Sequence, residues 1–273
     1  MLRERSVVSK RHACGVVSQP RSTQRLTPPV PSEDKEHLRA FLRAFVVKRP
    51  RWGWQRAAHA ARDAAQRVDN KRVHRLWRDE DLRVPEKKRN KPLGGIGLLV
   101  GAFCPIRPDV VWTLDFPFGQ TDNGRTIKAL NLIDELTREC PAIEVGRSID
   151  ADADVATLEK ITANRPAPIY LRFDNGPELI AHAVADWCRF NDAGTLFTDP
   201  GPRWQNAWIE SFNARMRDEH LNGWRFDSLL EAQVLTELWR IDHNNNRRHS
   251  GLGRLTPAAF AEAWTIRNRL SLA

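Results

Sequence analysis

The sequence predicts an α/β protein in which a short helical region precedes a mixed sheet flanked by helices. Between residues 32 and 84, apolar residues recur every three or four positions, which is the spacing of amphipathic helices. From residue 107 onward, short runs of β-branched and aromatic residues follow one another and then alternate with helical segments. A chain of 273 residues is long enough for one sizeable core and a smaller accessory domain.

The region 32–84 is predicted to form a helical, helix-turn-helix-like domain. Ser32 can cap a first helix, which Pro50 ends. A second helix is expected over 54–67, and a third begins near Asp69. Three short helices with a basic last helix are compatible with a module that presents its third helix to a DNA groove.

The charge of the chain is distributed unevenly. Residues 1–91 carry 24 Lys and Arg against 10 Asp and Glu, a net charge of +14, whereas residues 92–273 carry 19 against 24, a net charge of −5. A basic arm on a mildly acidic body favours DNA as the partner of the arm. We expect contacts to DNA from Lys71, Arg72 and Arg75, which fall largely off the apolar stripe of the third helix. A small bundle with solvated basic faces is the alternative.

The region 107–262 is predicted to form the main α/β core. Strands are expected at 110–116, 126–133, 142–145, 168–173 and 195–197, with helices over 152–163, 178–190 and from about 206. A hairpin turn at 121–125 joins the first two strands. Three antiparallel strands followed by alternating helices and strands is the order of a ribonuclease-H-like fold with a mixed five-stranded sheet.

The expected parts of the chain are a basic arm (1–31), the helix-turn-helix-like domain (32–84), a linker (85–106), the ribonuclease-H-like core (107–262) and a tail (263–273). The longest apolar run, 96–103, is shorter than the roughly 20 residues that span a bilayer, so no membrane partner is expected. The four cysteines lie far apart without a CxxC pair, which argues against a zinc knuckle or disulfide framework and fits a reducing cytoplasm.

Three carboxylates form the candidate active site. Asp115 lies in an otherwise apolar strand, where a charge is costly unless it is paired or bound to metal. Asp174 follows the strand 168–173, and Glu210 lies in a predicted helix 36 positions later. In a ribonuclease-H-like order these elements converge at one sheet edge. Carboxylates suit Mg²⁺ or Mn²⁺, and two such ions can activate a nucleophile and stabilise a leaving oxygen at phosphorus.

Other acids near strand ends are not expected to bind metal. Asp134 is interpreted as forming a turn, because it directly follows an apolar strand. Asp150, Asp152 and Asp154 are expected to be solvated or to cap a helix.

Several sequence blocks occur together in one order. They are RPRWGWQRA (49–57), NKRVHRLWRDEDLRVP (70–85), WTLDF (112–116), GRTIKALNLIDELTREC (124–140), DNGPEL (174–179), QNAWIESFNARMRDE (205–219) and HNNNRRHSGLGRLTP (243–257). These blocks resemble the OrfB-type catalytic subunit of two-reading-frame bacterial insertion-sequence transposases, a DDE integrase-core family related to retroviral integrases. The resemblance covers nearly the whole chain. The chain differs from the family pattern at His243, where tyrosine is usual, and at Arg248, where proline is usual.

The resemblance implies roles for individual residues. Asp115, Asp174 and Glu210 match the catalytic, metal-binding triad, which implies two bound Mg²⁺ or Mn²⁺ ions. Further contacts to DNA are expected from Asn175, Asn206, Arg217, Arg247, Arg248 and His249. Asn206 and Arg217 share the helical face of Glu210. A partner protein from the preceding reading frame, a homo-oligomer on DNA and a location in the bacterial cytoplasm are also implied.

The expected reaction is metal-dependent cleavage at element ends followed by attack of the freed 3′-hydroxyl on target DNA. One alternative is an inactive DNA-binding remnant or regulator of transposition, against which the intact triad argues. Another is a ribonuclease-H-like nuclease acting on RNA–DNA hybrids, against which the basic N-terminal region argues.

The charge distribution leads to a first prediction, that the N-terminal region binds DNA chiefly through phosphates. A fragment comprising residues 1–91 should bind duplex DNA with an affinity that falls steeply with salt, because each phosphate contact releases counterions. Fluorescence anisotropy at several salt concentrations measures this slope. A fragment that does not bind duplex DNA at low salt would contradict the prediction.

Overall fold

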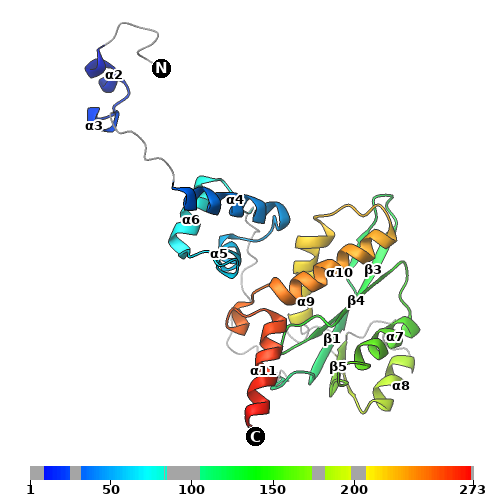
Figure 1. Cartoon of the computed structure of the whole chain (residues 1–273). Helices are drawn as coiled ribbons and strands as arrows, with labels where there is room; N and C mark the ends of the chain where they lie inside the picture. The colour runs from blue at the N-terminus through cyan, green and yellow to red at the C-terminus, as the bar shows by residue number, and fades with distance from the viewer. Residues whose placement is uncertain are drawn as a thin grey trace.

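The computed structural model contains a helical N-terminal region and an α/β core (Figure 1). It describes residues 9–24, 32–82, 84, 105–173, 182–197 and 207–271. Within these ranges, no helix is long and apolar enough to cross a membrane.

The N-terminal region contains five helices among the described residues. They are α2 (Lys10–Val16), α3 (Arg21–Gln24), α4 (Glu33–Lys48), α5 (Trp54–Asp63) and α6 (Asn70–Asp79). Helices α4 to α6 share an apolar core that includes Leu42, Trp52 and Leu76, as the periodicity predicted. Helix α5 ends four residues earlier than expected, because Ala65 adopts a φ of 58° and the amide of Gln66 closes the helix end on the carbonyl of Ala61.

The core sheet has the strand order of a ribonuclease-H-like fold, which confirms the predicted fold class. Its strands are β1 (Val111–Asp115), β2 (Phe118–Gln120), β3 (Thr126–Asp134), β4 (Ala142–Gly146), β5 (Tyr170–Phe173) and β6 (Gly194–Phe197). Strand β3 pairs antiparallel with β1, β2 and β4, while β5 lies parallel to both β1 and β6. The sheet has six strands, whereas five were expected. The additional strand is β2, which forms because the chain after Pro117 pairs with the first residues of β3.

Helices cover both faces of the sheet (Figure 1). Helices α7 (Ala151–Thr162) and α8 (His182–Phe190) enclose one apolar core, which contains Trp112 and Phe173. Helix α9 (Ala207–Met216), its π-helical continuation η2 (Arg217–Leu221) and α10 (Leu229–Asn246) enclose the other. A 3-10 turn, η3 (Ser250–Leu252), leads to α11 (Pro257–Ser271). The boundary expected between core and tail, at residue 262, falls inside α11.

The acids near strand ends serve mainly structural roles. Asp150 caps α7 by accepting a 3.0 Å hydrogen bond from the amide of Ala153, as expected. Asp154, which was expected to be solvated or to cap a helix, is instead fully buried. Its position on the inner side of α7, where the helix packs on the sheet, accounts for the difference.

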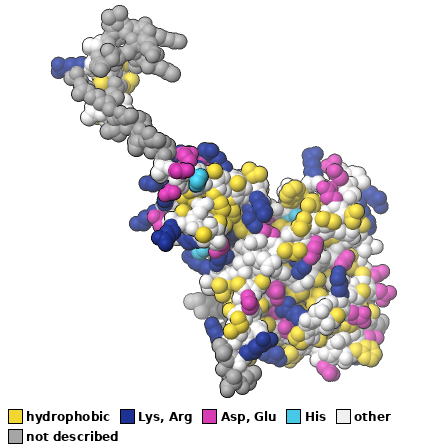
Figure 2. Space-filling model, in the orientation of Figure 1, with side chains coloured by type: hydrophobic (Ala, Val, Ile, Leu, Met, Phe, Trp, Pro, Cys, Tyr) yellow, Lys and Arg dark blue, Asp and Glu magenta, His cyan; other side chains and the backbone are white. Residues whose placement is uncertain are grey.

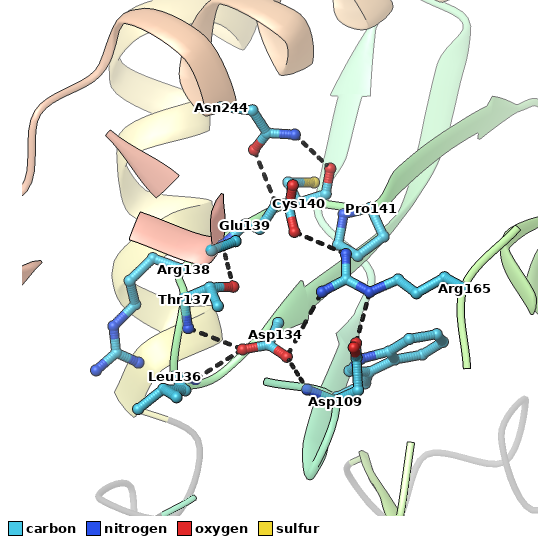
Figure 3. Close-up of polar contacts among 12 residues, drawn as sticks. Asp109, Asp134, Leu136, Thr137, Arg138, Glu139, Cys140, Pro141, Arg165 and Asn244 are labelled. Carbon is cyan, nitrogen blue, oxygen red and sulfur yellow. Dashed lines mark hydrogen bonds and ion pairs between the residues drawn. The ribbon is translucent and has the colours of Figure 1, made fainter. Parts of the chain in front are cut away.

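Asp134 organises the end of the sheet at which β1 begins (Figure 3). Its carboxylate accepts hydrogen bonds from the amides of Asp109 (2.7 Å), Leu136 (2.9 Å) and Thr137 (2.8 Å), which confirms its turn-forming role. Arg165 contacts the same cluster through Asp109 and Glu139. Burial raises the pKa of Asp134, and the amides of Thr137 and Asp109 and the charge of Arg165 oppose that shift.

This cluster leads to a prediction about stability. Replacing Asp134 by Ala leaves three amides without their acceptor and Arg165 with less compensating charge. Asp134→Ala should therefore lower the free energy of unfolding by about 3–5 kcal/mol, measured by urea denaturation. The control Asp186→Ala removes an exposed carboxylate on α8 and should change it by less than about 1 kcal/mol. A loss below about 1 kcal/mol for Asp134→Ala would contradict the prediction.

The helical region docks on the core through polar contacts. Arg49 forms an ion pair with Asp242 of α10, and Arg51 lies 2.7 Å from Asp218 of η2. The indole of Trp52 donates a hydrogen bond of 3.2 Å to Glu219. These contacts join two regions whose apolar cores are separate.

Two histidines, the buried His220 and the partly buried His249, make the fold sensitive to acid. His220 lies 2.9 Å from the hydroxyl of Thr236, and burial lowers its pKa to about 4. Burial, followed by the charges of Arg247 and Arg215, lowers the pKa of His249 to about 3. In the unfolded chain histidine has a pKa of about 6.5. Between these values the unfolded state binds protons that the folded state does not, so stability falls as the pH drops below about 6.5.

We therefore expect the free energy of unfolding to be lower at pH 5.0 than at pH 7.5, with His220 alone contributing on the order of 2 kcal/mol. Urea denaturation at the two pH values measures the difference. His220→Gln should reduce this pH dependence, whereas His37→Gln, at an exposed position on α4, should preserve it. Equal stability of the wild-type protein at both pH values would overturn the prediction.

Candidate active site

Asp115 is the last residue of β1, the strand that lies between β3 and β5. One carboxylate oxygen accepts a 2.8 Å hydrogen bond from the amide of Phe116. The other accepts a 2.6 Å hydrogen bond from the side chain of Asn213 on α9. The carboxylate is therefore held in a defined orientation at the end of a buried strand.

Asn213 is in turn held by Asn131, its neighbour on β3. The side-chain amide of Asn131 donates a 2.6 Å hydrogen bond to the side-chain oxygen of Asn213, and Asn131 pairs in the sheet with Asp115. Asn131 is fully buried. The chain of contacts from Asn131 through Asn213 to Asp115 links two strands and a helix, so the sheet and α9 together position the carboxylate.

Glu210 lies on the same side of α9 as Asn213. The two residues are three apart, which places them on neighbouring positions of one helical face. Glu210 is exposed, whereas Ile209 and Phe212 on the adjacent face are buried against the sheet. Arg217 begins η2 two turns after Glu210 and is also exposed. One edge of the helix therefore carries Glu210, Asn213 and Arg217. The shared face of Glu210 and Arg217 was expected from their spacing.

The remaining residues expected near the carboxylates, Asp174, Asn175 and Asn206, lie outside the described residues. Strand β5, which ends at Phe173, pairs directly with β1, the strand of Asp115. In the part of the chain that the structure describes, no group of three or more His, Cys, Asp or Glu side chains gathers as a metal site. The structure therefore brings together one expected carboxylate, Asp115, and the helix that carries a second, Glu210.

The basic residues predicted on α6 lie at the surface. Lys71 and Arg75 are exposed and Arg72 is partly exposed, while Val73 and Leu76 face the core. Lys and Arg side chains gather along the outer edge of the α4–α6 region (Figure 2). Among the described residues, no carboxylate lies within ion-pair distance of these three cations. That this face of α6 contacts DNA remains a prediction.

The basic segment after α10 lies partly inside the protein. Arg247 is only 2% exposed and forms an ion pair with Glu219, and its guanidinium lies 5.6 Å from the centre of the Trp52 ring. Arg248 binds Asp63 at the end of α5 with contacts of 2.7 and 2.9 Å. His249 is partly buried. These residues connect the two regions of the structure, and their contacts to DNA stay a prediction.

Asn213 and Asn131 were not among the site residues predicted from the sequence. A signal exists for Asn131, because a single amide stands among apolar residues of a strand that is otherwise buried. Asn213 lies in an amphipathic helix, where a polar residue is ordinary, so only the packing of α9 on the sheet shows its role. His243, where the resemblance implies a tyrosine, packs its ring against Phe212 and Trp239.

The contact between Asn213 and Asp115 leads to a prediction about rate. Asn213→Ala removes the donor that orients the carboxylate, so the metal-dependent strand transfer expected from the sequence should slow by about 10–100-fold and need a higher metal concentration for half-maximal rate. Gel assays over a Mg²⁺ titration measure both. Asn245→Ala, at an exposed position on α10, is the control and should leave both unchanged. A normal rate with a normal metal requirement in Asn213→Ala would exclude a positioning role.

Comparison with known proteins gives consistent matches along the chain. The sequence matches the family described as integrase core domain over residues 105–202 and again over residues 191–257. It is similar to the IS476 uncharacterized 39.2 kDa protein of Xanthomonas euvesicatoria, with 34% identity covering 94% of this chain and 74% of that protein. It is similar to the IS407 uncharacterized 31.7 kDa protein of Burkholderia multivorans, with 33% identity covering 95% of this chain and 93% of that protein.

More distant similarities extend to a named transposase and to a solved structure. The transposase InsF of insertion sequence IS3A from Escherichia coli is 26% identical over 80% of each chain. The HTLV-2 integrase catalytic core domain in complex with magnesium is 11% identical, covers 58% of this chain and 99% of its own, and has a TM-score of 0.47. The two insertion-element relatives, at 33% and 34% identity and with nearly complete coverage of this chain, decide the assignment. This chain belongs to the integrase-core family of insertion-sequence transposases.

Proposed function

We propose that this protein is the catalytic subunit that cuts phosphodiester bonds at the ends of an insertion element and joins them to target DNA. The observation that carries the proposal is the orientation of Asp115 at the end of β1 by a residue of the helix that also bears Glu210. Asp174, directly after β5, would complete the triad. DNA as substrate is supported by the family and by the exposed basic face of α6.

The chemistry of these residues fits divalent metal ions. Asp115 presents a hard oxygen donor whose orientation is set by the amide of Phe116 and the side chain of Asn213. Asp115, Asp174 and Glu210 would hold two Mg²⁺ or Mn²⁺ ions, because such ions favour carboxylate ligands. When bound, the ions supply positive charge at the phosphoryl group and lower the pKa of a water or 3′-hydroxyl.

The chain's own residues position the reactants. Asn213 prevents rotation of the Asp115 carboxylate, and Asn131 prevents rotation of Asn213. Arg217, at the exposed end of the same helical edge, is placed to bind a DNA phosphate through its planar guanidinium. The other proposed DNA contacts are Lys71, Arg72, Arg75, Asn175, Asn206, Arg247, Arg248 and His249. We further propose that the protein acts as a homo-oligomer on DNA in the bacterial cytoplasm, with a partner protein from the preceding frame.

The triad is tested by removing each carboxylate. Asp115→Ala, Asp174→Ala and Glu210→Ala should each abolish cleavage and joining of labelled element ends, and double changes should cost little more, because the three residues act as one unit. Mg²⁺ or Mn²⁺ should raise the melting temperature of the wild-type protein and raise those of the variants less. Asp186→Asn, on the exposed surface of α8, is the control and should keep activity.

Two outcomes would count against the proposal. Near-normal strand transfer by any of the three single variants would show that the site is misassigned. A wild-type protein that binds element ends but joins none of them, with either metal and with the partner protein present, would favour the inactive DNA-binding regulator instead.

A further inference from the structure

A basic hollow lies between the start of α5 and the segment after α10. Its volume is about 290 Å³. It is lined by Gly53, Trp54, Gln55, Arg56, His59, Arg248, His249, Ser250 and Arg254. Three arginines and two histidines face this space, and none of the lining residues is acidic. The helical region and the core each contribute part of the wall.

Two of the arginines have no acidic partner among the described residues. Arg56 lies over the ring of Trp52, 5.4 Å from its centre, and Arg254 approaches only the ring of His59 among the described polar side chains. Burial, followed by the charge of Arg247, lowers the pKa of Arg56 to about 10. Arg248, in contrast, is bound to Asp63. Within the described residues, the hollow therefore holds two guanidinium charges that form no ion pair with a carboxylate.

His59, one of the two histidines in the wall, is also surrounded by hydrogen-bond donors. One ring nitrogen of His59 lies 3.4 Å from the guanidinium of Arg62, and the other lies 3.4 Å from that of Arg254. A neutral imidazole accepts a hydrogen bond at only one nitrogen. Burial and the surrounding arginines lower the pKa of His59, so the neutral form is favoured. An oxygen-rich anion would supply the acceptors that this group of donors lacks.

The start of α5 adds to this field. The helix has ten residues, its N-cap is Gly53, and its first turn contains no acidic residue. No side chain caps the helix. The positive end of the helix dipole therefore lies beside the hollow, which Gly53, Trp54 and Gln55 line. This arrangement favours phosphate.

We propose that this hollow binds a phosphate group of the DNA backbone and so couples DNA binding to the docking of the helical region on the core. Arg56 belongs to α5, whereas Arg248 and Arg254 belong to the segment that follows α10. A phosphate bound by these three arginines would connect the two regions. It would add to the ion pairs that Arg49 and Arg51 already form across the interface. This site is separate from the triad and needs no metal.

The first arm of the test uses inorganic phosphate with the full-length protein in EDTA, at an ionic strength matched with chloride. Phosphate should raise the wild-type melting temperature saturably, by about 3 °C at tenfold excess over its dissociation constant. Arg56→Gln and Arg254→Gln should lose most of this increase. Arg189→Gln, on the exposed surface of α8, is the matched control and should retain it. An equal increase in all four proteins would overturn the site.

The second arm identifies the source of the phosphate. Anisotropy with a labelled DNA duplex should show about tenfold weaker binding by Arg56→Gln and Arg254→Gln, and a salt slope reduced by about one. Arg189→Gln should bind as the wild-type protein does. Variants that lose the response to inorganic phosphate but keep full DNA affinity and slope would overturn DNA as the occupant. Because both arms measure binding without metal, their outcome is independent of strand transfer.

Discussion

The core is organised around one costly feature, the charge of Asp115 at the end of a strand whose other residues are buried. The chain offsets this cost with two hydrogen bonds, one from the next backbone amide and one from Asn213. The second bond forms only when α9 packs on the sheet, which requires the apolar residues Ile209, Phe212 and Met216 to be buried. Formation of the proposed catalytic geometry is therefore coupled to formation of the core.

A second constraint concerns how the helical region attaches to that core. Each part buries its own apolar residues, so the surface between them is joined by charged and polar side chains such as Arg49, Arg51 and Glu219. The stability of a polar interface changes more with nearby charge than the stability of an apolar interface does. A polyanion that bound beside this interface would change its stability, which connects DNA binding to the relative placement of the two regions.

Local sequence patterns predicted the elements of the fold and their order well. The helices α4 and α6, and the strands β1, β3 and β5, lie within a few residues of their expected positions. The prediction was less accurate where backbone conformation or strand pairing decides the outcome. The early end of α5 depends on the left-handed conformation of Ala65, and β2 depends on its pairing with β3. Neither feature has a periodic signal in the sequence.

The sequence alone determined the fold class, the uneven charge and the placement of Asp115 on a strand and of Glu210 on a helix. These properties follow from hydrophobic periodicity, composition and motif spacing, which are local. Tertiary structure decided which side chains hold Asp115, that Arg247 lies inside the protein, and that a basic hollow forms beside α5. Those features join residues far apart in the chain, such as Asp115 with Asn213 and His59 with Arg254, and only the packing of separate elements brings them together.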